Sequence, residues 1–131
     1  MSEENVEIAR QAIEAWNEGD MDRLRDLYDP AAVYRNPSDW VDAGPYLGRD
    51  AIMQQFSQLR EVWSDESSFD RIDVLDAGDR VVVQVDFHGD TRGLPLTTEM
   101  AWVYTMRDGL IVSLEIFHSR EEALNALELS K

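Results

Sequence analysis

The chain has 131 residues, no cysteine and a formal net charge of −15, from 12 Lys and Arg against 27 Asp and Glu. This length fits one domain, residues 1–131, with a core of its own. The missing thiols exclude disulfides and zinc–thiolate sites and fit a reducing cytoplasm, and the acidic charge makes nucleic acid and anionic membranes poor partners. We find no signal peptide at the N-terminus and no apolar run near the roughly 20 residues that span a bilayer.

Apolar residues recur at helical spacing three times in the first half of the chain. Ser2 can cap a first helix, which Gly19 ends. A short second helix follows from Met21 and ends at Pro30, because proline cannot continue a helix. Asp50 can cap a third helix. Three helices are therefore expected before any long strand.

A short strand is predicted between the second and third helices, over Ala31–Asn36, followed by a loop with proline and glycine over Ser38–Gly48. After Ser64 the pattern changes to the alternation that is typical of strands. Four strands and a closing helix are expected, over Phe69–Leu75, Arg80–His88, Thr97–Met106, Leu110–Phe117 and Glu121–Leu129. Helices that precede a run of strands indicate an α+β fold.

The last two strands flank Arg107–Gly109, a sequence typical of a tight hairpin. With a two-residue turn there, Trp102 faces Glu115 and Met100 faces Phe117. The other face of the hairpin is then small and aliphatic, and neither face resembles a solvated surface. We therefore expect helices on one face and a second copy of the chain on the other, in a homodimer.

The stretch VVVQVDFHGD, residues 81–90, alternates apolar with polar side chains. Its polar row, Gln84, Asp86 and His88, is interpreted as part of a pocket wall. Taken alone, such a row also fits the solvated face of a strand. Further wall residues are expected among the large side chains, and these are Trp16, Phe56, Trp63, Met100, Trp102 and Phe117. Four tryptophans in a small domain favour a roomy aromatic cavity, although each also fits a packed core.

Several kinds of site have no signature in the sequence. The two histidines lack the spacing of a metal site, so no metal is expected. No glycine-rich phosphate loop and no G-x-S-x-G nucleophile turn is present, so no cofactor is expected.

Three stretches carry a family resemblance: AIEAWNEGDMDRLRDLYDPAAVYRNP, GRDAI and RDGLIVSLEIFHSREEAL. In this order they resemble the NTF2-like superfamily, in its SnoaL-like branch. The resemblance implies an α+β cone, in which three N-terminal helices pack on a curved, mostly antiparallel sheet and a short C-terminal helix closes the chain. This fold hosts isomerases, cyclases, hydrolases and binding proteins, so the fold alone does not select a function.

Within that branch, the site residues resemble those of limonene-epoxide hydrolases. Tyr34 and Asn36 match a Tyr-x-Asn on the first strand, and Asp86 and Glu115 match two acids on later strands. The resemblance implies that Glu115 deprotonates a water held by Tyr34 and Asn36. It also implies that Asp86 protonates the epoxide oxygen. Gln84 stands where that family has an arginine between the acids.

Three functions remain open. The first is a cofactor-free hydrolase or isomerase that acts on a small apolar molecule, which requires two carboxylates with separated pKa values. The second is a non-catalytic module that binds a small hydrophobic molecule, which requires only the cavity. The third is a partner-docking dimeric domain, which requires a filled cavity and an exposed apolar face. In the steroid-isomerase branch an aspartate takes the place of Asn36, and an amide cannot replace that base.

Overall fold

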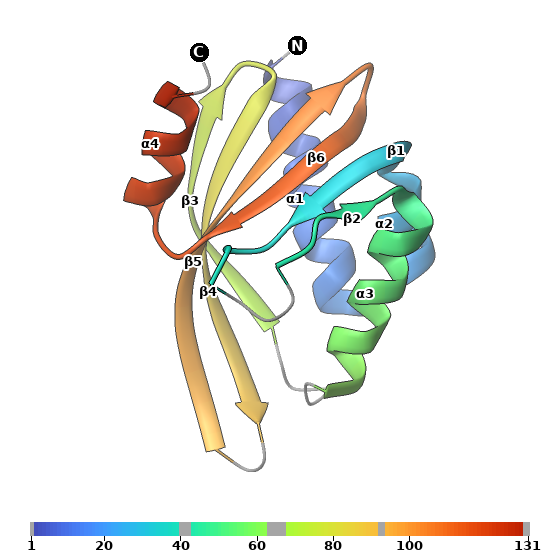
Figure 1. The fold of residues 1–131 in the computed structure, drawn as a ribbon, viewed down its shortest axis with the longest axis vertical. Helices are drawn as coiled ribbons and strands as arrows, with labels where there is room; N and C mark the ends of the chain where they lie inside the picture. The colour runs from blue at the N-terminus through green and yellow to red at the C-terminus, as the bar shows by residue number, and fades with distance from the viewer. Residues whose placement is uncertain (1, 40–42, 63–67, 92–93, 130–131) are drawn as a thin grey trace.

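A computed structural model of the chain describes residues 2–39, 43–62, 68–91 and 94–129. Its helices are α1 (Ser2–Glu18), α2 (Met21–Asp26), α3 (Arg49–Val62) and α4 (Arg120–Leu129). Its strands are β1 (Tyr28–Arg35), β2 (Tyr46–Leu47), β3 (Ser68–Ala77), β4 (Arg80–Thr91), β5 (Leu94–Arg107) and β6 (Leu110–Phe117). The strands form one sheet in the order β2-β1-β6-β5-β4-β3, in which only β1 and β6 are parallel (Figure 1).

Helices pack on both faces of this curved sheet (Figure 1). The face that contacts α1, α2 and α3 is called the inner face, and the face that contacts α4 is called the outer face. The inner face carries the main core, which includes Trp16, Phe56 and Trp102. A much smaller cluster joins α4 to the outer face through Ala123 and Val82. The predicted α+β cone is confirmed, with its three N-terminal helices, mostly antiparallel sheet and closing helix.

Several element boundaries differ from the prediction. β4 continues past His88 to Thr91, and β5 begins at Leu94, before Thr97. The largest differences lie around β1. β1 already begins at Tyr28, which was predicted on the second helix, and it runs through Pro30. Proline cannot donate to a strand ladder, and the pairing of β1 with β6 is irregular at this point. The short strand β2 lies in the stretch that was predicted as loop, where it pairs with β1.

The turn of the β5–β6 hairpin forms as predicted. Asp108 and Gly109 have φ values of 54° and 79°, and Arg107 pairs with Leu110. Two successive left-handed residues give the hairpin turn whose twist matches that of its strands.

The register of the same hairpin differs from the prediction because β6 contains a bulge. Val112 has no partner on β5, and every later pair is displaced by one residue. A displacement of one residue moves each following side chain to the opposite face. Trp102 therefore pairs with Ile116, not with Glu115, and Glu115 pairs with Val103.

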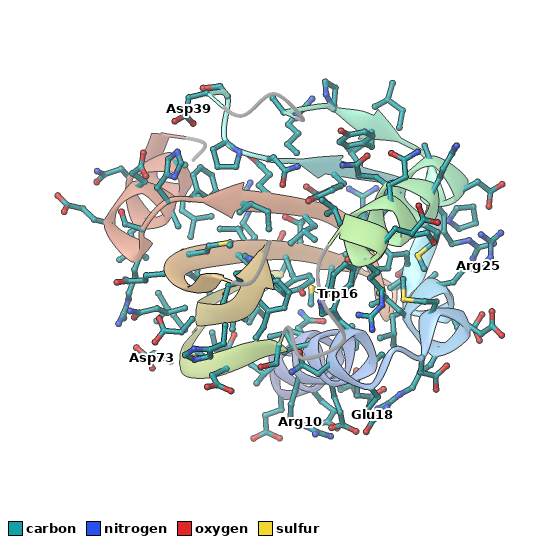
Figure 2. All side chains as sticks on the ribbon, turned by 90° about the horizontal axis from the view of Figure 1, so that it is seen from below. Arg10, Trp16, Glu18, Arg25, Asp39 and Asp73 are labelled. Atoms are coloured by element: carbon teal, nitrogen blue, oxygen red, sulfur yellow. The ribbon has the colours of Figure 1, made fainter. Side chains whose placement is uncertain are left out.

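Charged side chains lie at the periphery of the molecule. Figure 2 shows Trp16 in the interior, between the sheet and the helices, while Arg10, Glu18 and Arg25 point outward. Arg25 joins α2 to α3 through an ion pair of 2.6 Å with Asp50. Among the described residues, no helix is both long and apolar enough to cross a membrane.

Candidate functional site

A cavity of about 70 Å³ lies between the inner face of the sheet and the N-terminal helices. All three of those helices contribute to its wall, with Ala12, Trp16, Leu24, Phe56 and Leu59. Ala12 leaves room beside Trp16 because its side chain is a single methyl group. The cavity therefore occupies the part of the core where small and large side chains meet.

Four strands supply the rest of the wall. Side chains two positions apart on a strand point to the same face, so single strands contribute pairs and triplets of residues. From β1 come Tyr28, Tyr34 and, just past its end, Asn36; from β5 come Met100, Trp102 and Tyr104. Phe69 on β3 and Leu114 and Ile116 on β6 complete it.

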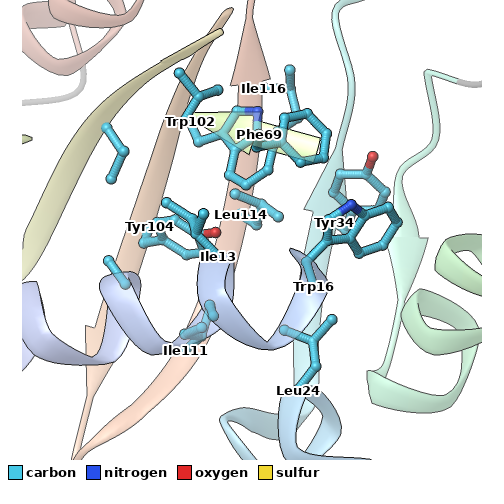
Figure 3. Close-up of a cluster of buried hydrophobic side chains, with 14 of the residues drawn as sticks. Ile13, Trp16, Leu24, Tyr34, Phe69, Trp102, Tyr104, Ile111, Leu114 and Ile116 are labelled. Carbon is cyan, nitrogen blue, oxygen red and sulfur yellow. The ribbon is translucent and has the colours of Figure 1, made fainter. Parts of the chain in front are cut away.

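Half of the lining residues are aromatic, and Figure 3 shows five of them: Trp16, Tyr34, Phe69, Trp102 and Tyr104. The ring of Phe56 lies edge-on to Trp16 and Tyr34, with centroid distances of 5.2 and 5.1 Å. On the sheet side, the rings of Phe69 and Trp102 are 4.5 Å apart at an angle of 66°. Edge-to-face contacts of this kind favour fixed ring positions, so the wall presents a defined shape.

None of the lining side chains carries a charge at neutral pH. Burial raises the pKa of the Tyr28 phenol well above its ordinary range, and the neighbouring Tyr104 and Tyr34 raise it further. Burial, with a contribution from Tyr34, likewise raises the pKa of Tyr104. Both phenols therefore stay protonated at any physiological pH, and the cavity is electrically neutral.

Tyr34 and Asn36 form the main polar feature of the wall. Both side chains are buried, and the Tyr34 hydroxyl donates a hydrogen bond of 2.6 Å to Asn36 Oδ1. The ring of Tyr46 on β2 stacks on Tyr34, with a centroid distance of 5.5 Å and an angle of 26° between the ring planes. The sequence prediction that Tyr34 and Asn36 lie together in a pocket agrees with this geometry.

The predicted placement of the two carboxylates in the pocket is wrong. Asp86 lies on the outer face, because its neighbours Val85 and Phe87 are the residues that enter the inner core. Glu115 also lies on the outer face, beside Val103, because the bulge reverses this part of β6. The sheet therefore separates both acids from Tyr34 and its partner amide.

The polar row of β4 belongs to a hydrophilic part of the outer face. Asp86 stands directly between Asp70 on β3 and Glu99 on β5. Gln84 Nε2 donates to Glu99 Oε1 at 2.8 Å, and His88 Nε2 lies 2.9 Å from Asp70 Oδ2. Within the described part of the chain, no group of three or more acids and histidines is placed to hold a metal ion.

The sequence also matches a known protein family. The SnoaL-like domain family matches the chain over residues 9–114. The chain belongs to the SnoaL-like domain family. No curated protein gives a significant match to the sequence.

Solved structures with the same fold support this assignment. Bal32a, from a soil-derived mobile gene cassette, is 27% identical, with a TM-score of 0.81 and 88% of each chain covered. A putative polyketide cyclase from Sinorhizobium meliloti is 23% identical, with a TM-score of 0.71 over 84% of this chain and 93% of the other. TerC, co-crystallised with polyporic acid, is 21% identical, with a TM-score of 0.78 over 95% and 97%. The last two show the fold alone.

Four of the predicted wall residues line the cavity of this SnoaL-like domain: Trp16, Phe56, Met100 and Trp102. Gln84 and His88 do not, for the reason given above, and Phe117 packs on the α4 side of the sheet instead. Trp63 lies outside the described residues.

The prediction missed several wall residues for two different reasons. Tyr104 follows Met100 and Trp102 in steps of two, so alternation along β5 was sufficient to find it. Leu114 and Ile116 were assigned to the opposite face because the bulge in β6 was not foreseen.

Proposed function

We propose that this SnoaL-like domain binds a small, neutral, mostly apolar organic molecule in the cavity between its inner face and its N-terminal helices. The observation that carries the proposal is the composition of the wall. Aromatic and aliphatic side chains surround one buried neutral polar pair, Tyr34 and Asn36, and no charged side chain lines the space. Apolar walls with few polar groups are typical of small-molecule sites.

The neutral wall selects against charged ligands. A carboxylate or an ammonium group that enters such a cavity loses its hydration and finds no opposite charge, which costs far more than the burial of a neutral oxygen. The cavity therefore favours ketones, ethers, alcohols and hydrocarbons over ionised acids and amines.

In the side-chain positions of this structure, the volume is smaller than one aromatic ring requires. At about 70 Å³, the cavity is smaller than the roughly 150 Å³ of an engineered apolar cavity that binds benzene. Met100 and the half-buried Leu59 lie in the wall, and unbranched methionine side chains adapt readily to an irregular guest. A one-ring ligand therefore requires these side chains to move as it enters.

The similar structures agree with a small-molecule role. One is described as a putative polyketide cyclase and another was crystallised with polyporic acid. These names support a small organic ligand and identify no particular compound.

Epoxide hydrolysis has no support from this arrangement. That reaction requires an acid and a base at one substrate, whereas Asp86 and Glu115 lie on the outer face, away from Tyr34.

The predicted homodimer stays a prediction, and sedimentation equilibrium at several protein concentrations would test it.

A set of three probes with similar shapes tests the proposal. Acetophenone is neutral, benzoate is an anion and 1-phenylethylammonium is a cation, and binding of each is followed by calorimetry or by NMR. We expect acetophenone to bind at least about 10-fold more tightly than either ion. The cation makes the comparison stringent, because the net charge of −15 attracts it to the surface.

A pair of variants locates the binding. Ala12→Leu places three more carbon atoms in the cavity and should abolish acetophenone binding. Ala31→Leu makes the same change at an exposed position of β1 and should leave binding unchanged. Binding that survives Ala12→Leu, or a preference for either ion, would contradict the proposal.

A further inference from the structure

Trp102 lines the cavity, and its indole nitrogen is a buried hydrogen-bond donor. Trp102 is only 7% exposed, and its side chain lines the cavity from β5. Its Nε1 atom is inaccessible to solvent and has no hydrogen-bond partner among the described residues. A buried donor without a partner is unfavourable, and folded proteins tolerate few of them. Such an atom at a cavity therefore needs an explanation.

The nearest aromatic ring does not provide one. Phe69 packs against Trp102 with centroids 4.5 Å apart and ring planes at 66°. The face of a phenyl ring accepts an N–H group only weakly compared with an oxygen atom. The donor is therefore left without a strong acceptor on the β3 side.

The Tyr34–Asn36 pair does not supply an acceptor to Trp102 in the described contacts. The Tyr34 hydroxyl donates its hydrogen bond to Asn36 Oδ1. In Figure 3 the Trp102 nitrogen and the Tyr34 hydroxyl both lie toward the same end of the cluster, away from Leu24.

We infer that Trp102 Nε1 is a specificity-determining donor that selects ligands with a neutral acceptor oxygen, such as a ketone, over hydrocarbons of the same shape. This inference rests on the proposed function and deepens it. The ring of the ligand would lie among the aromatic side chains. Because Nε1 is covered in this structure, neighbouring side chains would have to move as the ligand enters for its oxygen to reach the indole N–H. A hydrocarbon would fill the same space but would leave the donor unpaired.

Two isosteric probes isolate this hydrogen bond. Acetophenone and α-methylstyrene have the same skeleton, with a carbonyl oxygen in one and a methylene group in the other. A single neutral hydrogen bond predicts that the native protein binds acetophenone about 3- to 10-fold more tightly. The Trp102→Phe variant keeps an aromatic ring but removes the N–H, so this preference should fall to about 1.

Trp16→Phe is the matched control. Trp16 also lines the cavity, on the helix side. Its replacement should weaken the binding of both probes by a similar factor and leave the ratio of their affinities unchanged.

A measurement on the native protein gives the answer even if Trp102→Phe does not fold. The chain has four tryptophans, so a proton–nitrogen NMR spectrum shows four indole N–H signals. We expect acetophenone to shift the Trp102 signal downfield, as a new hydrogen bond does. α-Methylstyrene should not cause this downfield shift.

The outcomes separate this inference from the proposed function. If both probes bind equally well, or if the ketone preference survives in Trp102→Phe, the role of Trp102 is overturned while the binding function stands. If neither probe binds to the native protein, the proposed function fails, and the inference fails with it.

Discussion

The two faces of the sheet are built by the same strands but have opposite chemistry. On β4, Val83 and Val85 are fully buried on the inner face, while the alternate residue Asp86 stands beside Glu99 on the outer face. The inner face is neutral and encloses a cavity, whereas the outer face carries neighbouring carboxylates.

This difference shows that a row of polar residues on a strand does not by itself mark a site. The carboxylates that resemble a catalytic pair lie where water and salt screen them. The feature with a buried, enclosed geometry is the neutral pair of Tyr34 and Asn36. Burial, rather than charge, distinguishes the candidate site in this molecule.

The largest expected effect comes from two substitutions at neighbouring positions of β6, one that places an acid on the inner face and one that places a leucine on the outer face. Leu114 is buried on the inner face, while Glu115 points outward. Leu114→Glu buries a carboxylate among aromatic rings and should cost more than about 3 kcal/mol in the free energy of unfolding. Glu115→Leu should change that free energy by less than about 1 kcal/mol. Urea denaturation measures both, and comparable losses in the two variants would mean that the bulge is misplaced.

A smaller loss is expected when the buried polar pair is broken. Tyr34→Phe removes the hydroxyl and leaves Asn36 Oδ1 without that donor. The free energy of unfolding should fall by about 1–2 kcal/mol, measured by thermal denaturation. An unchanged free energy of unfolding would argue against the buried hydrogen bond.

On the outer face, neutralising a carboxylate should have an effect that depends on its neighbours. Asp86 lies between two acids, so Asp86→Asn should stabilise the protein by a few tenths of a kcal/mol at low salt. Asp73 pairs instead with Arg120 of α4, so Asp73→Asn should destabilise it by up to about 1 kcal/mol. Both effects should shrink in 1 M salt, at which the Debye length is about 3 Å. If Asp86→Asn abolishes ligand binding, the separation of the two faces is wrong.

The smallest effect concerns a single exposed pair. His118 Nε2 lies 2.7 Å from Asp39 Oδ1 and holds the pKa of Asp39 below its ordinary value. A lowered carboxyl pKa adds stability above the unfolded pKa, and this contribution is lost as the pH falls through the folded pKa. His118→Ala should therefore raise the pKa of Asp39 toward its ordinary value, which an NMR titration of the side-chain carboxyl would record. An unchanged pKa would show that the contact does not form in solution.

Much of the fold could be predicted from the sequence because local signals agreed with it. Helical periodicity located α1 and α3, and Asp108–Gly109 fixed the turn of the last hairpin. The bulge could not be predicted in the same way. Every residue of LIVSLEIF is compatible with a strand, and nothing in that stretch identifies Val112 as the one without a partner.

The candidate site was predictable only where it did not depend on that register. Tyr34 on β1 and Asn36 just past its end lie two residues apart, so their shared face follows from alternation alone. The face occupied by Glu115 depends on how many residues separate it from the turn along a bulged strand. One unpaired residue is enough to move it to the other side of the sheet.

A crystal structure of the native protein soaked with acetophenone tests the central claim most directly. The account predicts that the ring lies between Phe56 and Trp102 in the inner cavity, with the carbonyl oxygen toward Trp102 Nε1. Acetophenone bound on the outer face beside Asp86 and Glu115, with the inner cavity empty, would contradict it.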